Sequence, residues 1–278
     1  MHEILGHPLF GTMFSIFRQL LFICYNATDH VLNIEQSLSV ENMQRLHTSQ
    51  VCTLHMNRIC NLFEYLYINK ENTSTISNKN TFEAKHLISS IAENFANTVS
   101  GYAEVQISFT PKAQASPVLI EKTKFELAVF NLLYCSLHNI GDNAGTLKLN
   151  LYITENKEQT IFHIRDNSKI INKEIIDFVF SDEDMSFDED ALFDSVVALS
   201  LNAAAKATSD MGGRLAYSAL KSGNRYDIIV PKSQETGKVY TAHSVATYTP
   251  NFAYLHEILA SIQVEKLLKD LPPIGDEL

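Results

Sequence analysis

The chain begins MHEILGHPLF, which places a histidine beside a carboxylate at the head of a long apolar repeat. An imidazole titrates near neutral pH and a neighbouring acid can polarise it, so His2 with Glu3 could accept a phosphoryl group. Alternatively, both are polar residues at a helix N-terminus, where Pro8 is tolerated in the first turn. These residues alone leave both interpretations open.

The other histidines and the cysteines give weaker chemical signals. His7 directly precedes the proline, while His30, His47 and His55 fall on helical patterns, where a surface or packing role is usual. The cysteines have no paired spacing, which argues against a metal site and predicts a reducing, cytoplasmic environment. Walker, HExxH and Ser/His/Asp patterns are absent from the sequence, so P-loop and hydrolase functions lack support.

The composition and net charge of the chain limit the classes of partner that it can bind. The chain has 278 residues, 45% of them hydrophobic, and a net charge of −10. A core can form, and the acidic balance argues against nucleic acid or an anionic membrane as a partner. Apolar runs are shorter than a membrane span, and the first residues do not resemble a signal peptide, so we expect no membrane contact.

Two long helices are predicted at the N-terminal end. Apolar residues recur at alternating four- and three-residue intervals, at Leu9, Met13, Ile16, Leu20, Ile23, Ala27 and Val31. Ser39 is a good N-cap for a second helix that runs to about Tyr67. The pair should form an antiparallel hairpin over residues 1–70, and its uncovered apolar face predicts a homodimer with a four-helix bundle.

The pattern changes after a polar linker near residues 69–75. Helices are expected at 86–99, 124–139 and 195–210, and alternating strands at 105–109, 146–153, 160–165, 214–218 and 225–230. This order predicts an α+β sandwich over 78–232, with helices on one face of a sheet. Residues 233–278 form an extension with one helix from 252 to 268, which packs on its own domain or on a partner.

Four ordered segments resemble the catalytic core of bacterial sensor histidine kinases. Phe125 to Leu133 resembles the helix that leads into the asparagine box, and Asp166-Asn167 follows a strand as in the DxGxG loop. Leu199-Ser200-Leu201 and Met211-Gly212-Gly213 resemble the GLGLS…HGGRI segment. The resemblance implies a dimerisation and phosphotransfer hairpin followed by a GHKL-type ATPase domain with Asn131, His138, Ala198 and Leu199 at its pocket.

Several pocket positions depart from the family pattern. The resemblance places Cys135 where the family has its magnesium-binding asparagine, and a thiol suits a hard cation poorly. Asp166 matches the aspartate that accepts from the adenine amino group, but Ser168 and Ile170 replace the two glycines of its loop. The family's glycine-rich phosphate-binding loop corresponds here to Asp194-Ser195-Val196-Val197-Ala198. The segment that corresponds to the family's lid, Ser181 to Asp190, contains six acidic side chains and no basic one.

The family's histidine box has five steps from histidine to proline, whereas His2 and Pro8 are six steps apart. One extra residue turns a helix by about 100°, which moves His2 off the face the family uses unless a bulge restores it. His138 lies where the family often has a basic residue near the phosphates. We expect His138 to have a packing role here instead.

We therefore hypothesise a two-component signalling dimer with a degenerate ATP site and no cofactor. It would act as a histidine phosphotransferase or a scaffold for the receiver domain of a response regulator. The alternative is an active ATP- and magnesium-dependent histidine kinase with an atypical pocket. A third possibility is an α+β interaction module that shares only the fold.

Overall fold

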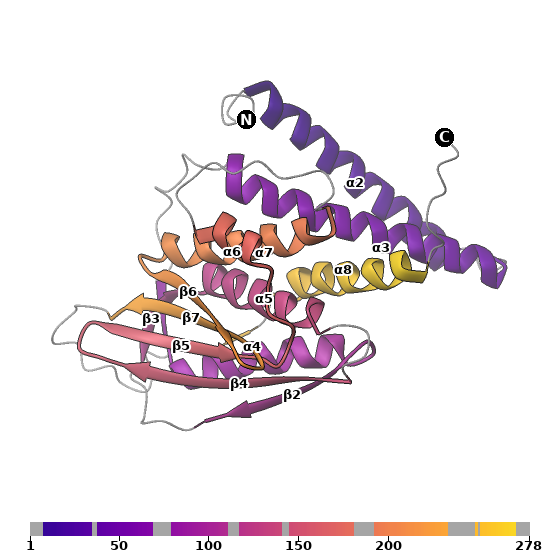
Figure 1. The fold of residues 1–278 in the computed structure, drawn as a ribbon. Helices are drawn as coiled ribbons and strands as arrows, with labels where there is room; N and C mark the ends of the chain where they lie inside the picture. The colour runs from indigo at the N-terminus through magenta and orange to yellow at the C-terminus, as the bar shows by residue number, and fades with distance from the viewer. Residues whose placement is uncertain are drawn as a thin grey trace. The chain divides into compact units, whose positions relative to one another are not determined.

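The computed structural model describes residues 8–34, 38–68, 79–110, 117–140, 145–180, 192–232, 248–249 and 251–270 (Figure 1). The chain divides into two compact units. The helical unit contains residues 1–69 and 252–278, and the sandwich unit contains residues 70–251. The candidate pocket residues lie in the sandwich unit, and His2 with Glu3 lies outside the described residues.

The helical unit begins with the expected hairpin. Helix α2 spans Pro8–Ile34 and helix α3 spans Val40–Phe63, continuing as a π-helical turn over Glu64–Ile68. Ser39 caps α3 as predicted, since its hydroxyl accepts a hydrogen bond from the Asn42 backbone N–H at 3.2 Å. The two helices lie side by side in Figure 1. The predicted helical hairpin is confirmed.

Helix α8, Phe252–Asp270, packs against α3 within the helical unit. Val51 of α3 forms a buried apolar cluster with Ala260 and Val264 of α8. Polar contacts fix the register, because the Asn57 and Asn61 amides both donate to Oε1 of Glu257, at 2.7 and 2.9 Å. Burial raises the pKa of Glu257. The sequence left the neighbour of this helix open, and the structure places it on α3.

The apolar stripe of α2 is not buried by the packing of the helices in this unit. Ile16, Leu20 and Ile23 keep 51%, 53% and 61% of their surface exposed, and Val31 keeps 38%. Leu21, which lies between stripe positions, is buried at 7% exposure. The heptad positions therefore form an open seam along the helix.

The sandwich unit is built on a five-stranded sheet of order β2-β4-β5-β7-β6. Strands β2 (Glu104–Phe109) and β4 (Thr146–Glu155) are parallel, and all other neighbours are antiparallel. The remaining strands are β5 (Gln159–Arg165), β6 (Arg214–Leu220) and β7 (Gly223–Pro231). The strands predicted from alternation are all present.

Three helices pack on one face of this sheet: α4 (Ala84–Val99), α5 (Lys122–His138) and α7 (Leu192–Asp210). Helix α5 is buried on nearly every side, with Phe125 against Phe162 of β5 at a ring-centroid distance of 4.8 Å. Along each strand, alternate residues such as Leu147, Leu149 and Leu151 point into this core. The predicted α+β sandwich is confirmed.

Three short elements were not predicted. Strands β1 (Lys79–Phe82) and β3 (Val118–Glu121) pair antiparallel as a separate ribbon, and helix α6 spans Lys173–Phe180. Each is too short to show a clear period in sequence.

The end of α7 matches its glycine signal. Gly212 has a φ of +80° and follows the last turn as a left-handed cap. Gly213 approaches β7 so closely that a Cβ there would lie 2.2 Å from the Ile229 carbonyl oxygen. None of the helices that the structure describes has a stretch apolar and long enough to cross a bilayer.

Candidate functional site

The carboxylate of Asp166 is the centre of the candidate site, directly after β5 and facing α5. The side chain is buried, with 5% of the residue exposed. Oδ2 accepts a hydrogen bond from the Ser136 hydroxyl at 2.5 Å. Oδ1 accepts from the Ser168 N–H and hydroxyl, both at 3.0 Å, and from the Asn224 N–H and Nδ2 at 2.9 and 3.0 Å. Five protein donors thus surround one carboxylate.

Asn224 of β7 connects this carboxylate to the neighbouring loop and strand. Its Nδ2 also donates to the Ser168 hydroxyl at 2.9 Å and to the Lys169 carbonyl at 3.0 Å. Its Oδ1 accepts from the Tyr217 hydroxyl at 2.7 Å and from the Ile171 N–H at 3.3 Å. The amide therefore fixes the chain after Asp166 against the β6–β7 hairpin.

Gly223 makes this close approach possible. Its φ is +117°, in the region that favours glycine, and a Cβ there would lie 1.9 Å from the Asp166 carbonyl oxygen. The Asp166 N–H in turn donates to the Asn224 carbonyl at 3.0 Å. The β6–β7 turn and the Asp166 loop are thus held together by backbone as well as side chains.

Cys135 lies one residue before Ser136, fully buried between α5 and α7. Its thiol is 3.7 Å from the Val197 carbonyl of α7. The Tyr226 phenol is fully buried, and its pKa is raised well above the usual value, first by burial and then by the nearby Asp166 and Cys135. This environment is that of a packed interior.

The remaining predicted positions on α5 are also engaged within the protein. Asn131 has no exposed surface, and its Nδ2 donates to the Leu127 carbonyl one helical turn earlier, at 2.8 Å. His138 is half-buried, with its ring 6.0 Å from that of Tyr134. Its packing role stays a prediction.

The other predicted positions divide between core and surface. Ala198 is fully buried beside Val197, and Leu199 is half-buried on α7. Ile170 is 52% exposed. The structure thus brings Asp166 and Ser168 into direct contact, buries Cys135 next to Ser136, and leaves Ile170 exposed to solvent. The acidic segment 181–190 lies outside the described residues.

Two residues central to this network were missed in the sequence. Ser136 is adjacent to Cys135, and Asn224 follows Gly223 at the start of β7, directly after the turn between the last two strands. A Gly-Asn pair at a hairpin turn is a common turn signal, so only the turn could have been inferred from it.

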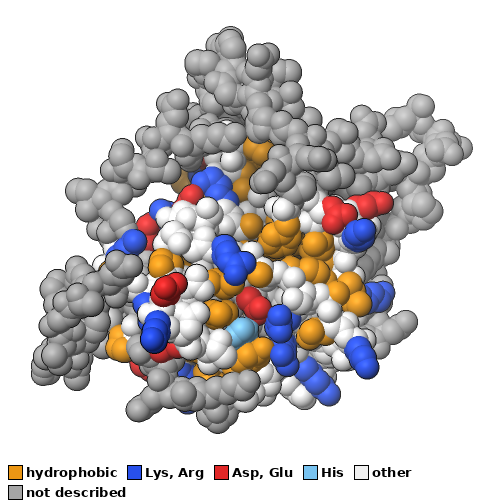
Figure 2. All heavy atoms as spheres, turned by 60° about the vertical axis from the view of Figure 1, so that its left-hand side comes forward, with side chains coloured by type: hydrophobic (Ala, Val, Ile, Leu, Met, Phe, Trp, Pro, Cys, Tyr) orange, Lys and Arg blue, Asp and Glu red, His pale blue; other side chains and the backbone are white. Residues whose placement is uncertain are grey.

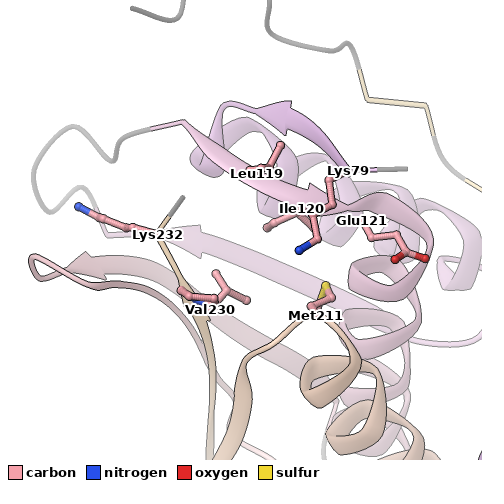
Figure 3. Close-up of a pocket in the computed structure, with 8 residues that line it drawn as sticks. Lys79, Leu119, Ile120, Glu121, Met211, Val230 and Lys232 are labelled. Carbon is pink, nitrogen blue, oxygen red and sulfur yellow. The ribbon is translucent and has the colours of Figure 1, made fainter. Parts of the chain in front are cut away.

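A separate cavity of about 220 Å³ opens between the β1–β3 ribbon and the end of β7 (Figure 3). Apolar side chains such as Leu119, Ile120 and Met211 line it together with Lys79 and Lys232. None of its lining residues is a candidate site residue. Among the described residues there is no group of three or more His, Cys, Asp or Glu side chains that could hold a metal ion.

The fold has clear relatives among solved structures. No family model and no curated protein matches the sequence. The histidine kinase AdeS of Acinetobacter baumannii is 14% identical, with a TM-score of 0.50, over 77% of this chain and 96% of AdeS. Full-length ShkA in complex with AMPPNP is 12% identical, with a TM-score of 0.59, over 82% of this chain and 46% of ShkA. This chain has the fold of a sensor histidine kinase core.

The histidine kinase-like fold places α5, the Asp166 loop and α7 together, as the sequence resemblance implied. The predicted resemblance and fold class are confirmed by these structures. Asp166, the residue that the sequence resemblance matches to the family's aspartate, is surrounded by protein donors in this structure.

We predict that Asp166→Ala destabilises the sandwich unit by about 3 kcal/mol, because it leaves several buried donors without an acceptor. Urea denaturation measures the loss. Glu174→Ala, at an exposed position on α6, is the control and should change stability by less than about 0.5 kcal/mol. A loss below about 1 kcal/mol for Asp166→Ala would mean that the carboxylate does not hold this region together.

Proposed function

We propose that the chain is a two-component signal transduction protein that works as a dimer without ATP. It either passes a phosphoryl group through His2 or positions a receiver domain on the hairpin. The observation that carries this proposal is the Asp166 carboxylate, which receives five hydrogen bonds from the protein itself.

The hydrogen-bond count argues against adenine at this position. An ionised carboxylate offers about four lone-pair sites. Four of the five protein donors converge on Oδ1, and the Ser136 hydroxyl occupies one of the two sites on Oδ2. An adenine amino group would therefore have to share Oδ2 with the buried Ser136 hydroxyl, at a carboxylate whose charge the protein donors already stabilise.

The expected magnesium position is equally unsuited to its ion. Cys135 is fully buried and its thiol faces the Val197 carbonyl. Mg²⁺ requires oxygen ligands in octahedral geometry and usually keeps several waters. The residues present therefore do not fit the metal–nucleotide pair that the resemblance implies, and we assign the chain no cofactor.

The alternative function is an ATP-dependent histidine kinase with an atypical pocket. The retained Asp166, the Gly212-Gly213 cap and the fold shared with ShkA, which was solved with AMPPNP, favour it. We rank it second because the fold alone does not bring activity.

The open seam of α2 supports a homodimer through the hairpin. Ile16, Leu20 and Ile23 follow heptad spacing and are each more than half exposed. A sustained a/d repeat is the pattern that a second helix of a coiled coil or bundle covers. A second copy of the same chain supplies that helix.

His2 and Glu3 are the proposed phosphotransfer residues. In the forward step a nitrogen of His2 would attack the phosphorus of a receiver aspartyl phosphate, and the aspartate carboxylate would leave. We propose a cytoplasmic location, with neither nucleic acid nor membrane as a partner of this chain.

We predict that isothermal titration of the full chain with Mg·ATP gives no heat of binding at ligand concentrations up to about 1 mM. This range corresponds to a binding free energy weaker than about −4 kcal/mol. The matched variant Ser136→Ala removes one donor from Asp166 and tests whether that donor blocks the site. Micromolar affinity in the unmodified chain would contradict the degenerate pocket and favour the kinase.

We predict that receiver domains from the same genome, phosphorylated with labelled acetyl phosphate, transfer label to this chain in an acid-labile, base-stable form. His2→Ala should abolish transfer, whereas His30→Ala on exposed α2 should leave it unchanged. If no receiver transfers label to the unmodified chain, the scaffold role replaces phosphotransfer.

We predict that light scattering after size exclusion gives about twice the 31.3 kDa chain mass for the unmodified protein. Leu20→Glu should shift it to one chain mass, because it places a charge in the apolar seam. Asn26→Glu, exposed on the same helix, is the control and should remain dimeric. A dimer that survives Leu20→Glu would place the interface elsewhere.

A further inference from the structure

The face of the sheet opposite α4, α5 and α7 carries an unusual charge. Lys148, Arg165, Arg214 and Arg225 alternate with core residues and therefore share this face, here called the basic face. Figure 2 shows Lys and Arg side chains gathered on this side around a histidine and an acidic group. Among the described residues of this face, the four cations are opposed by two carboxylates, Asp227 and Glu104, in a chain whose net charge is −10.

Two of these arginines are direct cross-strand neighbours. The register pairs Arg165 of β5 with Arg225 of β7, flanked in the same row by Asn150 and Ser218. Like charges directly opposite each other destabilise an antiparallel pair. An anion lying across both would relieve that repulsion.

Both guanidinium groups are held in place. Arg165 lies over the Tyr152 ring, 5.0 Å from its centroid. Arg225 donates from Nη2 to the Ser218 hydroxyl at 3.2 Å, and its Nε is 3.2 Å from Oδ2 of Asp227. Because these contacts restrict the side chains before binding, a partner would lose less entropy in ordering them.

A hydrogen-bonded histidine lies in the next row of the same face. His163 Nδ1 lies 2.6 Å from Oδ1 of Asp227, and its Nε2 lies 2.7 Å from the Thr154 hydroxyl. The ring stacks on Tyr152 with centroids 4.2 Å apart. Asp227 thereby faces both Arg225 and His163, and Glu104 interacts electrostatically with Lys148. In the described residues, Arg165 and Arg214 have no hydrogen bond or ion pair to a carboxylate of this face.

The spread of the cations indicates the size of the partner. The register places Lys148 and Arg214 three strands apart laterally and six residues apart along the strands. Strand spacing and rise convert this to about 25 Å. A single phosphate cannot contact both ends, so the face fits an extended molecule with several negative charges.

Among such molecules, an acidic protein segment fits better than nucleic acid. Base-stacking platforms need exposed aromatic rings, and Tyr152 is only 7% exposed between Arg165 and His163. Alternate side chains of an extended peptide lie about 7 Å apart, which is also the spacing of successive rows on this face. We propose that the basic face docks an extended acidic segment of a partner protein.

The test measures fluorescence anisotropy of a labelled peptide of alternating glutamate and serine, about ten residues long so that it spans the face. The full chain should bind it at low salt and release it as salt rises. The variant Lys148→Gln/Arg165→Gln, at two exposed positions, should bind at least tenfold more weakly. The control Lys173→Gln/Lys266→Gln, which changes net charge equally at exposed sites elsewhere, should bind within twofold of the unmodified chain.

Three results would overturn the proposal. They are absence of binding at low salt, an equal loss in the control variant, and tighter binding of a single-stranded oligonucleotide of the same length than of the acidic peptide. Thermal unfolding followed by circular dichroism confirms that each variant is folded. The peptide assay requires neither ATP nor His2, so its outcome is independent of the proposed phosphotransfer.

Discussion

The buried carboxylate of Asp166 organises the sandwich unit. It links helix α5 through Ser136, its own loop through Ser168 and strand β7 through Asn224. A buried carboxylate is tolerated only when donors surround it, and its removal leaves those donors without an acceptor. The position of the loop, the turn at Gly223 and the packing of α5 all depend on this one group.

The same constraint bears on function. The proposed loss of ATP binding rests on this anchoring, because four protein donors converge on Oδ1 of Asp166 and the Ser136 hydroxyl donates to Oδ2. The buried Cys135 thiol, one residue from Ser136, extends the packed interior to the position expected for the metal. Under the proposed function, the sandwich unit keeps the shape of the fold and signalling takes place at its surfaces and at those of the helical unit.

Those surfaces lie on both units. The seam of α2 is apolar and regularly spaced, whereas the basic face of the sheet is charged and flat. Helix α8 covers part of α3 through Glu257 and its two asparagine partners, and the seam stays uncovered in the described residues. Each surface has its own chemistry, so a dimer partner and an acidic partner need not compete.

The sequence determined the local elements and their order. Ser39 predicted the start of α3, Gly212 predicted the end of α7, and alternation predicted the five strands of the sheet, because capping, left-handed glycine and side-chain period act over a few residues. The resemblance of Asp166 to the family aspartate also came from sequence. Only the tertiary structure showed that Ser136 and Asn224 donate to that carboxylate, that Arg165 faces Arg225, and that α8 packs on α3. Those contacts join residues from 30 to about 200 positions apart, and the strand register and helix packing that bring them together are set by the whole core.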